Sequence, residues 1–424
     1  MLYLGSLSMG ILVLSCLSNN IFRQQDQVLA QQYIQTIKFR NLVIDLGNGV
    51  KTNAQLTYPA IGKGPFPGVL LIHGSGAHDK NETLGYVHKN GAQPPKPFWQ
   101  IAQYLSERGF VVLRYDKRGI GANKTILNND VWGNLTANQL KQDAEKALNV
   151  LIQQSEVNPK KITLIGHSEG TIIVPRVTID NPTKVKNIVL MGTVAQNLSD
   201  ILHFQNVDEP LLLVKQILDK DHDGILSLSE VASKLNGSAL DAATREAANS
   251  LVEKNNKTGQ YVWRPGLDAN KVDAVNIDKE LRPLLVNAFK SLAPFPTGKC
   301  TSLEPCRIWV KSVFALQPNL SVIGNLSSTN ILILNGENDS QTPVQQAFLL
   351  QQRLTELNHP DHTLITYPSL GHAFYPSSQW STALGPIQQY ILADLYAWLE
   401  AHSGLSHTVT YSASHKASNM TFNS

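Results

Sequence analysis

The amino-acid sequence predicts an α/β protein, in which a mostly parallel sheet is covered by helices on both faces and is interrupted by a mainly helical insertion. The first observation is that continuous apolar runs alternate with segments of helical spacing over residues 31–197 and again over residues 328–402. Such alternation indicates parallel strands that are buried on both faces. The second observation is that the alternation stops over residues 198–327, which are polar and mainly helical in pattern. We expect this insertion to fold over the sheet as a cap above the functional site, which in such sheets lies at the carboxyl ends of the strands.

The expected elements follow in chain order. A hairpin at residues 39–46 and 54–58 opens the fold, because Gly47-Asn48-Gly49 between its strands is a turn signal. Buried strands are expected at residues 67–73, 110–115, 162–165 and 185–191, with helices at residues 97–108, 139–154 and 171–178. After the insertion, strands are expected at residues 330–335 and 363–367, with helices at residues 344–357 and 387–402. Residues 403–424 are rich in Ser, Thr and Asn, which predicts a disordered polar tail.

Composition sets the outer limits of function. The 424 residues, 42% of them hydrophobic and 16% charged, suffice for one large core and an accessory unit. The net charge of +3 is close to balance, so we expect no nucleic-acid partner. Oligomeric state does not follow from these quantities.

The N-terminal 30 residues have the pattern of an export leader. Residues 2–17 are apolar and almost uncharged, and at about 16 residues they fall short of the roughly 20 that a spanning helix needs. Cleavage after Ser18 is compatible with the small-residue rule, and an uncleaved or lipid-linked anchor at Cys16 is the alternative. The expected location is secreted or extracytoplasmic, with membrane association only through this segment. Cys300 and Cys306 are then candidates for a small disulfide loop, or remain free thiols.

The strongest local motif is G-H-S-E-G at residues 166–170, with Ser168 at its centre. An aliphatic run at residues 162–165 precedes it and an apolar, potentially helical segment at residues 171–178 follows. Strand, sharp turn and helix form the setting in which this motif exposes a serine hydroxyl above the end of a sheet. The five-residue motif also arises by chance, and the strand before it and the helix after it distinguish a nucleophile turn from a chance match. We expect Ser168 to be a nucleophile.

Two further residues complete a hydrolytic set. Asp339 follows the expected strand at residues 330–335, and His372 follows the strand at residues 363–367. Both lie in loops on the edge where the serine turn opens, in the chain order Ser, Asp, His. In such a set His372 takes the proton from Ser168 and returns it to the leaving group, while Asp339 orients the imidazole. Glu337 is the alternative acid; each residue alone could also be an ordinary turn or surface residue.

The oxyanion hole is expected between two loops. One donor is the backbone N–H of Glu169, directly after the nucleophile, and the other is an N–H of the loop after residues 67–73, assigned here to Ser75. Gly74 and Gly76 on either side of Ser75 allow that loop to approach a bound carbonyl, although a tight turn would need them as well.

On these motifs the chain resembles the α/β-hydrolase superfamily, in particular its exported esterase and serine-aminopeptidase-like branch. The resemblance rests on H-G-S-G and the charged stretch after it (residues 73–82), Y-D-K-R-G-I-G (residues 115–121) and G-H-S-E-G, and it covers residues 55–192 and 328–399. Thr171 departs from the pattern, since many members carry another glycine there. The resemblance implies the fold and the triad. It leaves the substrate open, because that branch mixes carboxylesterases, acyltransferases and peptidases.

The insertion carries a second motif. Residues 219–230 read D-K-D-H-D-G-I-L-S-L-S-E, which matches the twelve-residue loop of a calcium-binding EF-hand. Gly224 would make the sharp turn, and the apolar Leu226 occupies the eighth place. A solvated acidic turn is the alternative. The expected ligands are Asp219, Asp221, Asp223, the carbonyl of Ile225, Ser227 and a bidentate Glu230.

EF-hands usually occur in pairs, and residues 268–279 fit the same frame imperfectly. Val275 occupies the eighth place, but Asp273 stands where glycine belongs and Lys279 where the closing carboxylate belongs. We expect a partner loop that pairs structurally and binds no metal.

Together these patterns predict an exported serine hydrolase, a carboxylesterase that acts on small-molecule esters without a catalytic cofactor and holds one structural Ca²⁺ in its cap. A serine peptidase or acyltransferase could use the same triad. A calcium-dependent cell-surface binding module is the alternative from another class, and the complete Ser, Asp and His set argues against it.

Overall fold

The computed structural model describes residues 36–85, 93–237, 242–264, 273–292, 307–379 and 383–405. Its centre is an eight-stranded sheet in the order β1-β2-β4-β3-β5-β6-β11-β12, which confirms the predicted fold class. β1 and β2 are antiparallel, β2 joins β4 antiparallel, and the remaining neighbours are parallel. The strands are β1 (Ile37–Gly47), β2 (Val50–Pro59), β3 (Phe66–Ile72), β4 (Val111–Tyr115), β5 (Val157–His167), β6 (Val185–Met191), β11 (Asn330–Gly336) and β12 (His362–Tyr367).

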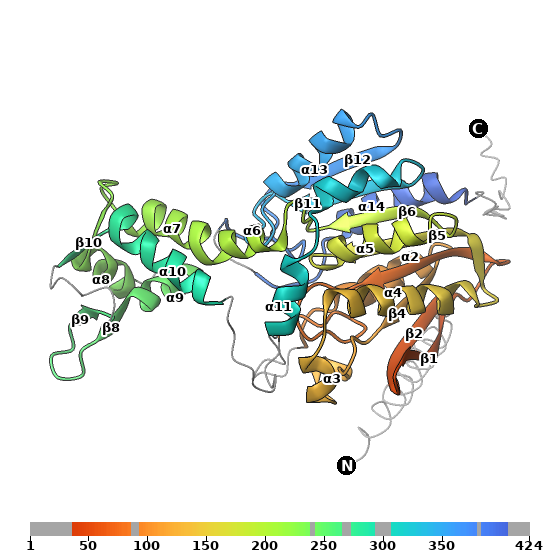
Figure 1. Cartoon of the computed structure of the whole chain (residues 1–424), viewed down its shortest axis with the longest axis horizontal. Coiled ribbons are helices and arrows are strands. Elements are labelled where there is room, and N and C mark those ends of the chain that lie inside the picture. The colour runs from red at the N-terminus through yellow and green to blue at the C-terminus, as the bar shows by residue number, and fades with distance from the viewer. Residues whose placement is uncertain are drawn as a thin grey trace, which may run out of the picture.

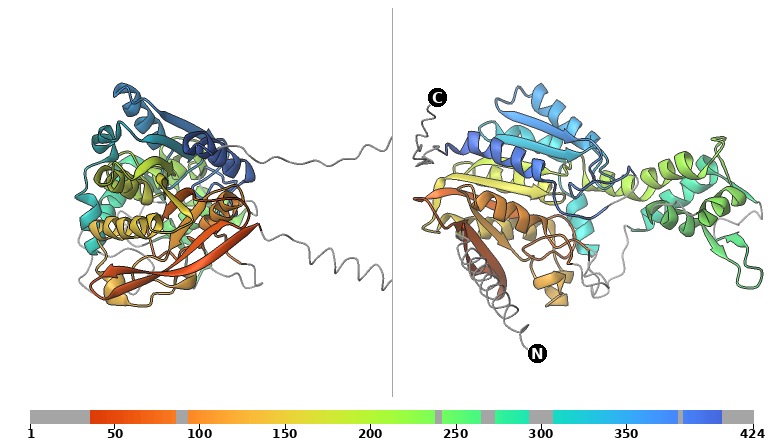
Figure 2. Two further views of the ribbon diagram at one scale, coloured as in Figure 1. Left: turned by 90° about the vertical axis from the view of Figure 1, so that its right-hand side faces the viewer. Right: turned by 180° about the vertical axis from the view of Figure 1, so that it is seen from behind.

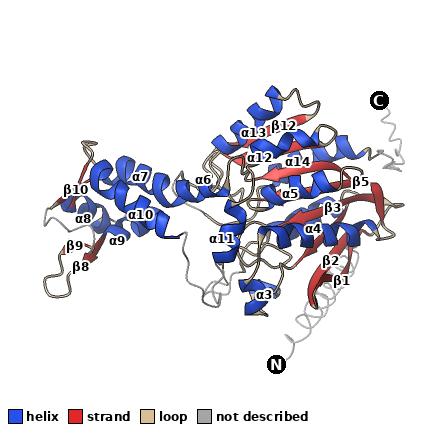
Figure 3. Ribbon diagram, viewed as in Figure 1, coloured by secondary structure: helices blue, strands red, loops and turns tan. Residues whose placement is uncertain are grey.

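Helices cover both faces of this sheet (Figure 3). α4 (Ala137–Ile152), α5 (Gly170–Asp180) and α13 (Gln345–Glu356) pack on one face, and α2 (Pro97–Ser106) and α14 (Gln389–Ser403) pack on the other. The central strand β3 alternates between them, with Leu70 and Ile72 in the first core and Val69 and Leu71 in the second. This alternation with a period of two explains why the strand reads as an unbroken apolar run.

The insertion begins at α6 (Leu198–His203) and ends before β11. Most of it forms a lobe with a hydrophobic core of its own, which includes Leu211, Val231, Trp263 and Val275. Figures 1 and 2 show that the lobe extends away from the sheet, on the side to which β6 leads. The apolar side chains of the lobe are buried within the lobe itself and not against a face of the sheet.

The elements of the insertion are mainly helical. They are α6, α7 (Glu209–Leu213), α8 (Leu228–Asn236), α9 (Ala242–Leu251), α10 (Arg282–Leu292), α11 (Arg307–Phe314) and α12 (Asn319–Val322), together with π-helical turns at Phe204–Asp208, Val214–Leu218 and Ile277–Leu281. The insertion also contains four short strands that its sequence pattern does not predict, because three residues carry no periodicity. These are β7 (Ile225–Ser227), β8 (Val252–Lys254), β9 (Tyr261–Trp263) and β10 (Ala274–Asn276).

Several sequence-based expectations fall outside the described residues. These are the leader at residues 1–30, the cysteine pair Cys300 and Cys306, and the polar tail beyond residue 405. Within the part that the structure describes, no helix combines the length and the apolar character needed to cross a membrane.

Candidate active site

Ser168 lies at the sharp turn between β5 and α5, as its motif predicts. Its φ of 53° is in the left-handed region, which a non-glycine residue rarely adopts, and its N–H donates to the carbonyl of Met191 at 2.9 Å. The turn depends on its glycines: a Cβ on Gly170 would collide with the carbonyl oxygen of Ile72, and a Cβ on Gly166 would collide with Gly170. The hydroxyl-bearing residue is thereby held at the carboxyl end of the sheet.

Asp339 and His372 meet on the same edge. The loop after β11 carries Asp339 and the loop after β12 carries His372, and both side chains are buried. His372 Nδ1 lies 2.8 Å from Asp339 Oδ2. The carboxylate also accepts from the N–H groups of Gln341 and Thr342, at 2.9 and 2.8 Å, and from the Thr342 hydroxyl at 2.9 Å. Because a carboxylate only accepts, Nδ1 carries the proton and Nε2 is left as the basic nitrogen.

Ser168 and His372 line one cavity of about 190 Å³. Its other described walls include Gly74, Ser75 and Gln341, all from loops of the core. None of the described residues that line it belongs to residues 198–327. The lobe contacts the loop that carries Asp339: Gln205 donates through its side-chain amide to the carbonyl of Gln341 at 2.7 Å, and Glu209 hydrogen-bonds the side chain of Ser340.

The two expected oxyanion loops are tied together by a buried lysine. Lys117 Nζ lies 2.9 Å from Glu169 Oε2 and also donates to the carbonyl of Gly74. The indole N–H of Trp309, on α11, donates to the other oxygen of Glu169. Gly74 donates its own N–H to Glu82 Oε1 at 2.7 Å, so the next N–H on that loop is that of Ser75. Lys117 thereby holds the two expected oxyanion loops against one another.

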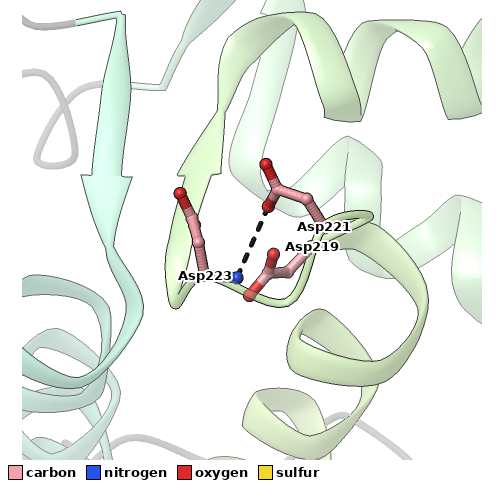
Figure 4. A group of neighbouring side chains, drawn as sticks. All are labelled: Asp219, Asp221 and Asp223. Atoms are coloured by element: carbon pink, nitrogen blue, oxygen red, sulfur yellow. Dashed lines mark hydrogen bonds between the residues drawn. The ribbon is translucent and has the colours of Figure 1, made fainter.

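The second candidate site lies in the lobe. Asp219, Asp221 and Asp223 gather their carboxylates around one loop, with one oxygen of each within 4.8 Å of the others (Figure 4). Gly224, at a φ of 80°, makes the turn and donates to Asp219 Oδ2 at 3.0 Å. Asp219 is only 2% exposed, and its other oxygen has no hydrogen-bond partner among the described residues. A buried carboxylate oxygen without a donor, beside two further carboxylates, fits a hard cation such as Ca²⁺.

Two of the expected ligands are turned toward other partners. Glu230 accepts from the N–H of Lys220 at 2.8 Å through Oε1, and from the N–H and hydroxyl of Ser227 at 2.8 and 2.7 Å through Oε2. Ser227 and Glu230 thus form the capping box of α8. Ile225 lies in β7, its side chain partly exposed. The structure therefore brings the three aspartates together, whereas the Glu230 carboxylate is hydrogen-bonded to Lys220 and Ser227.

The imperfect partner loop pairs with this one. β10 runs antiparallel to β7, and Val275 lies opposite Leu226, so the residues at the eighth place of each loop face one another. Leu228 donates to the carbonyl of Asp273 at 2.8 Å, and Ile277 to that of Gly224 at 3.0 Å. The predicted structural pairing is present. The first residues of the partner loop, 268–272, lie outside the described residues.

Four residues of the site were not singled out from the sequence. Lys117 and Glu82 lie in the two charged motifs quoted above, but their types alone do not say what they contact. His167 is a variable place of G-x-S-x-G, and Trp309 lies in the insertion without any local signal. Lys117, His167 and Trp309 contact residues of the site that are more than 50 positions away in the chain, and Glu82 contacts the loop of Gly74. Only the tertiary structure shows these contacts.

Comparisons with known proteins agree with this architecture. Residues 67–378 match the family model of the alpha/beta hydrolase fold. The chain is 30% identical over 179 residues to Esterase EstD of Thermotoga maritima, a match that spans 39% of each chain, and 32% identical over 88 residues to the uncharacterized protein YfhR of Escherichia coli, over 21% of this chain and 28% of that protein.

Among solved structures, a thermostable carboxyl esterase of Bacillus coagulans superposes with a TM-score of 0.50 at 15% identity, covering 86% of this chain and 99% of the other. At that identity the likeness speaks for the fold alone. The family model, in contrast, spans most of the chain and both loops that carry Asp339 and His372. The chain belongs to the alpha/beta hydrolase fold family.

Proposed function

We propose that this chain is an exported carboxylesterase that works through Ser168, His372 and Asp339 and forms an acyl-enzyme. One observation carries the proposal: Ser168, on its left-handed turn, and His372, whose Nδ1 is held by Asp339 at 2.8 Å, line the same cavity. The curated relative named an esterase, which shares only part of its length with this chain, supports the same chemistry.

The reaction would begin when His372 Nε2 takes the proton of the Ser168 hydroxyl as its oxygen attacks the ester carbonyl. The N–H groups of Ser75 and Glu169 would stabilise the negative oxygen of the tetrahedral intermediate. His372 would then protonate the departing alcohol as the C–O bond breaks, leaving an acyl-Ser168. Water, deprotonated by the same imidazole, would hydrolyse this ester and regenerate the serine. Asp339 would stabilise the imidazolium at each protonation.

The cavity favours small substrates. Its volume of about 190 Å³ is below the roughly 300 Å³ at which pockets for drug-sized ligands begin. We expect short acyl groups such as acetyl and butyryl to be hydrolysed in preference to long ones. Serine peptidase and acyltransferase chemistry would use the same triad, and assays with aminoacyl arylamides and with acceptor alcohols distinguish them from esterase chemistry.

We also propose that the loop of Asp219–Glu230 binds one structural Ca²⁺. The buried oxygen of Asp219 without a donor supports this, as does the pairing of β7 with β10. Asp219, Asp221, Asp223 and the carbonyl of Ile225 would hold the ion, with Ser227 near the ninth place and Glu230 turning from its cap to complete the shell. The helical run that ends at Asp219 also carries Gln205, so the ion would steady the contact with Gln341.

Isothermal titration with Ca²⁺ tests this site. Wild type should bind one ion, and Asp219→Asn should abolish binding, whereas Glu253→Gln, at an exposed acid of the same lobe, should not. Ligand at about 1,000 times its dissociation constant stabilises a folded state by roughly 4 kcal/mol, so chelator should lower the melting temperature of wild type and of Glu253→Gln only. Identical melting of wild type with Ca²⁺ and with chelator would remove the calcium proposal.

Export is the third part of the proposal, and it rests on the leader pattern of residues 1–30. Expression of the full chain in a secreting host should yield protein outside the cytoplasm that begins after Ser18. Intact mass spectrometry of the recovered protein measures this. A full-length cytoplasmic product would argue against an export leader.

The hydrolase proposal is tested by turnover of p-nitrophenyl acetate, butyrate and decanoate by wild type and by Ser168→Ala. We expect serine-dependent turnover that declines from the short to the long ester. Ser168→Ala should retain the melting temperature of wild type, since the hydroxyl contributes little to packing. Equal turnover by both proteins would show that Ser168 is not the nucleophile. Activity on arylamides alone would move the proposal to a peptidase.

A further inference from the structure

Two buried titratable side chains beside the triad have no part in the steps above. Glu82, in the loop after β3, is 1% exposed, and His167, the residue before Ser168, is 7% exposed. Both line the cavity that Ser168 and His372 share. His167 Nδ1 lies 3.1 Å from Glu82 Oε2, as an ion pair whose alignment is poorer than that of a good hydrogen bond. Burying two titratable groups costs folding free energy, so their presence beside the triad indicates a role there.

The contacts of His167 define its protonation. Its Nε2 lies 3.1 Å from the backbone oxygen of His372, and since a carbonyl only accepts, Nε2 carries a proton. Nδ1 faces the Glu82 carboxylate, and an unprotonated Nδ1 would place its lone pair against the negative carboxylate oxygen. The ring is therefore best satisfied as an imidazolium. Burial alone would lower the pKa of His167, but the Glu82 carboxylate, the His372 carbonyl and Asp339 together outweigh burial and the pKa is raised. Burial likewise favours neutral Glu82, yet the charge of His167 keeps its pKa below the usual range.

Glu82 reaches a second loop of the site. Its other oxygen, Oε1, accepts from the N–H of Gly74 at 2.7 Å. Gly74 directly precedes Ser75, the expected oxyanion donor. The pair thus connects three segments: the loop of Ser75 through Glu82, the loop of His372 through its carbonyl, and the end of β5, which carries both His167 and the nucleophile. The rings of His167 and His372 lie 4.7 Å apart between centroids.

We propose that Glu82 and His167 are positioning residues, which hold the loops of Ser75 and His372 in register with Ser168 and present a fixed positive charge to His372. The inference rests on the proposed function, because it takes His372 as the base. The charge of His167 lies beside the His372 ring, whose orientation Asp339 fixes. Because Glu82 balances that charge, the pair as a whole serves to hold His372 in place beside Ser168.

Other titratable groups lie near the pair. Lys117 pairs with Glu169, and burial lowers the pKa of His78 to about 3, so that His78 adds no charge at neutral pH. Glu209, which hydrogen-bonds the side chain of Ser340 next to Asp339, has its pKa raised to about 7, mainly by burial. Glu209 is unchanged in every variant below, so a shift of the pH profile between variants is assigned to the pair.

The test compares His167→Asn, Glu82→Gln and the double variant with wild type, in the full chain. His359→Asn is the matched control, because His359 is also buried and also contacts a carbonyl, that of Leu326 at 3.0 Å, away from the site. Melting temperatures report folding, and kcat and kcat/KM for p-nitrophenyl butyrate are measured from pH 5 to 9.

In His167→Asn we expect kcat to fall about 10- to 100-fold and the acid limb of kcat/KM to move about one unit to higher pH, because a positive charge is lost and the negative Glu82 remains. In the double variant the limb should return toward wild type, because the positive and the negative charge are both removed and their opposite effects cancel, while kcat stays low, because neither loop is tied. His359→Asn should change neither. The proposal would be overturned if kcat fell while the acid limb stayed unmoved in both His167→Asn and the double variant. Wild-type kinetics of folded His167→Asn would overturn it as well.

A second measurement does not depend on activity. Histidine Cε1–H NMR signals of wild type should show one imidazole that stays protonated at a pH where free histidine is neutral, and Glu82→Gln should abolish that behaviour. If wild type shows this signal but no serine-dependent turnover, the proposed function fails while the ion pair stands. If turnover is serine-dependent but no imidazole stays protonated at a pH where free histidine is neutral, the positioning pair fails alone.

Discussion

Lys117 is the cation on which the two expected oxyanion loops converge, and Lys117→Met tests how they are held. Lys117 and Glu169 are 3% and 2% exposed, and Nζ lies 2.9 Å from the carboxylate while it also donates to the carbonyl of Gly74. The substitution keeps most of the aliphatic volume and removes the charge. It would leave the Glu169 carboxylate buried with the Trp309 indole as its remaining side-chain donor.

The expected cost follows from that burial. Removing one partner of a buried ion pair destabilises proteins by about 3–5 kcal/mol, and because Trp309 still donates to Glu169 we expect the lower end, about 3 kcal/mol. Turnover should fall as well. Losing one oxyanion donor costs roughly 100- to 1,000-fold in kcat, and donors that are displaced rather than lost should cost about 10- to 100-fold.

Urea denaturation followed by tryptophan fluorescence measures the stability of Lys117→Met, Glu169→Gln and the double variant. The control is Lys141→Met, which breaks ion pairs with Glu145, at 3.0 Å, and with Asp180 near the surface and should cost about 1 kcal/mol or less. The double variant should recover part of the loss, because no unpaired charge remains buried. If Lys117→Met costs no more than Lys141→Met, or if the two single effects simply add, the buried pair does not organise these loops.

Three further outcomes are expected. Asp339→Asn should lower kcat by about 10⁴ with an unchanged melting temperature, because the amide can no longer fix the imidazole tautomer; a loss below tenfold in the ester assay would argue for another acid. Wild type should lose stability as the pH rises from 4.5 to about 7, because burial raises the pKa of Glu209 from 4.5 to about 7 and the folded state there keeps a proton that the unfolded chain has released. Glu209→Gln should remove this loss, and melting temperature against pH measures it. Gly170→Ala should fail to fold at 37 °C, because its Cβ would strike the carbonyl oxygen of Ile72; soluble, active protein would show that the turn can move.

Local sequence patterns predicted the elements well where burial is two-sided or helical spacing is regular. The strand at residues 185–191 has the predicted bounds, and α4 begins two residues before the predicted start because Thr136 and Gln139 form a capping box. The three-residue strands of the insertion escaped prediction, since so short a segment carries no period. The separate core of the lobe was not predicted either, because a polar helical stretch does not reveal whether its apolar residues pack on the sheet or on one another.

The sequence by itself determined the fold class, the serine turn, the order of Ser168, Asp339 and His372, and the spacing of the acidic loop, because each depends on residues within a short window and on the rule that parallel strands end on one edge. Only the tertiary structure decided that Glu82 and His167 pair beside the base and that Trp309 reaches Glu169 from the insertion. It also turned Glu230 toward the start of α8. The physical reason is that hydrogen bonds and ion pairs are selected by distance and burial in three dimensions, and contacts between residues far apart in the chain leave no periodic signal in it.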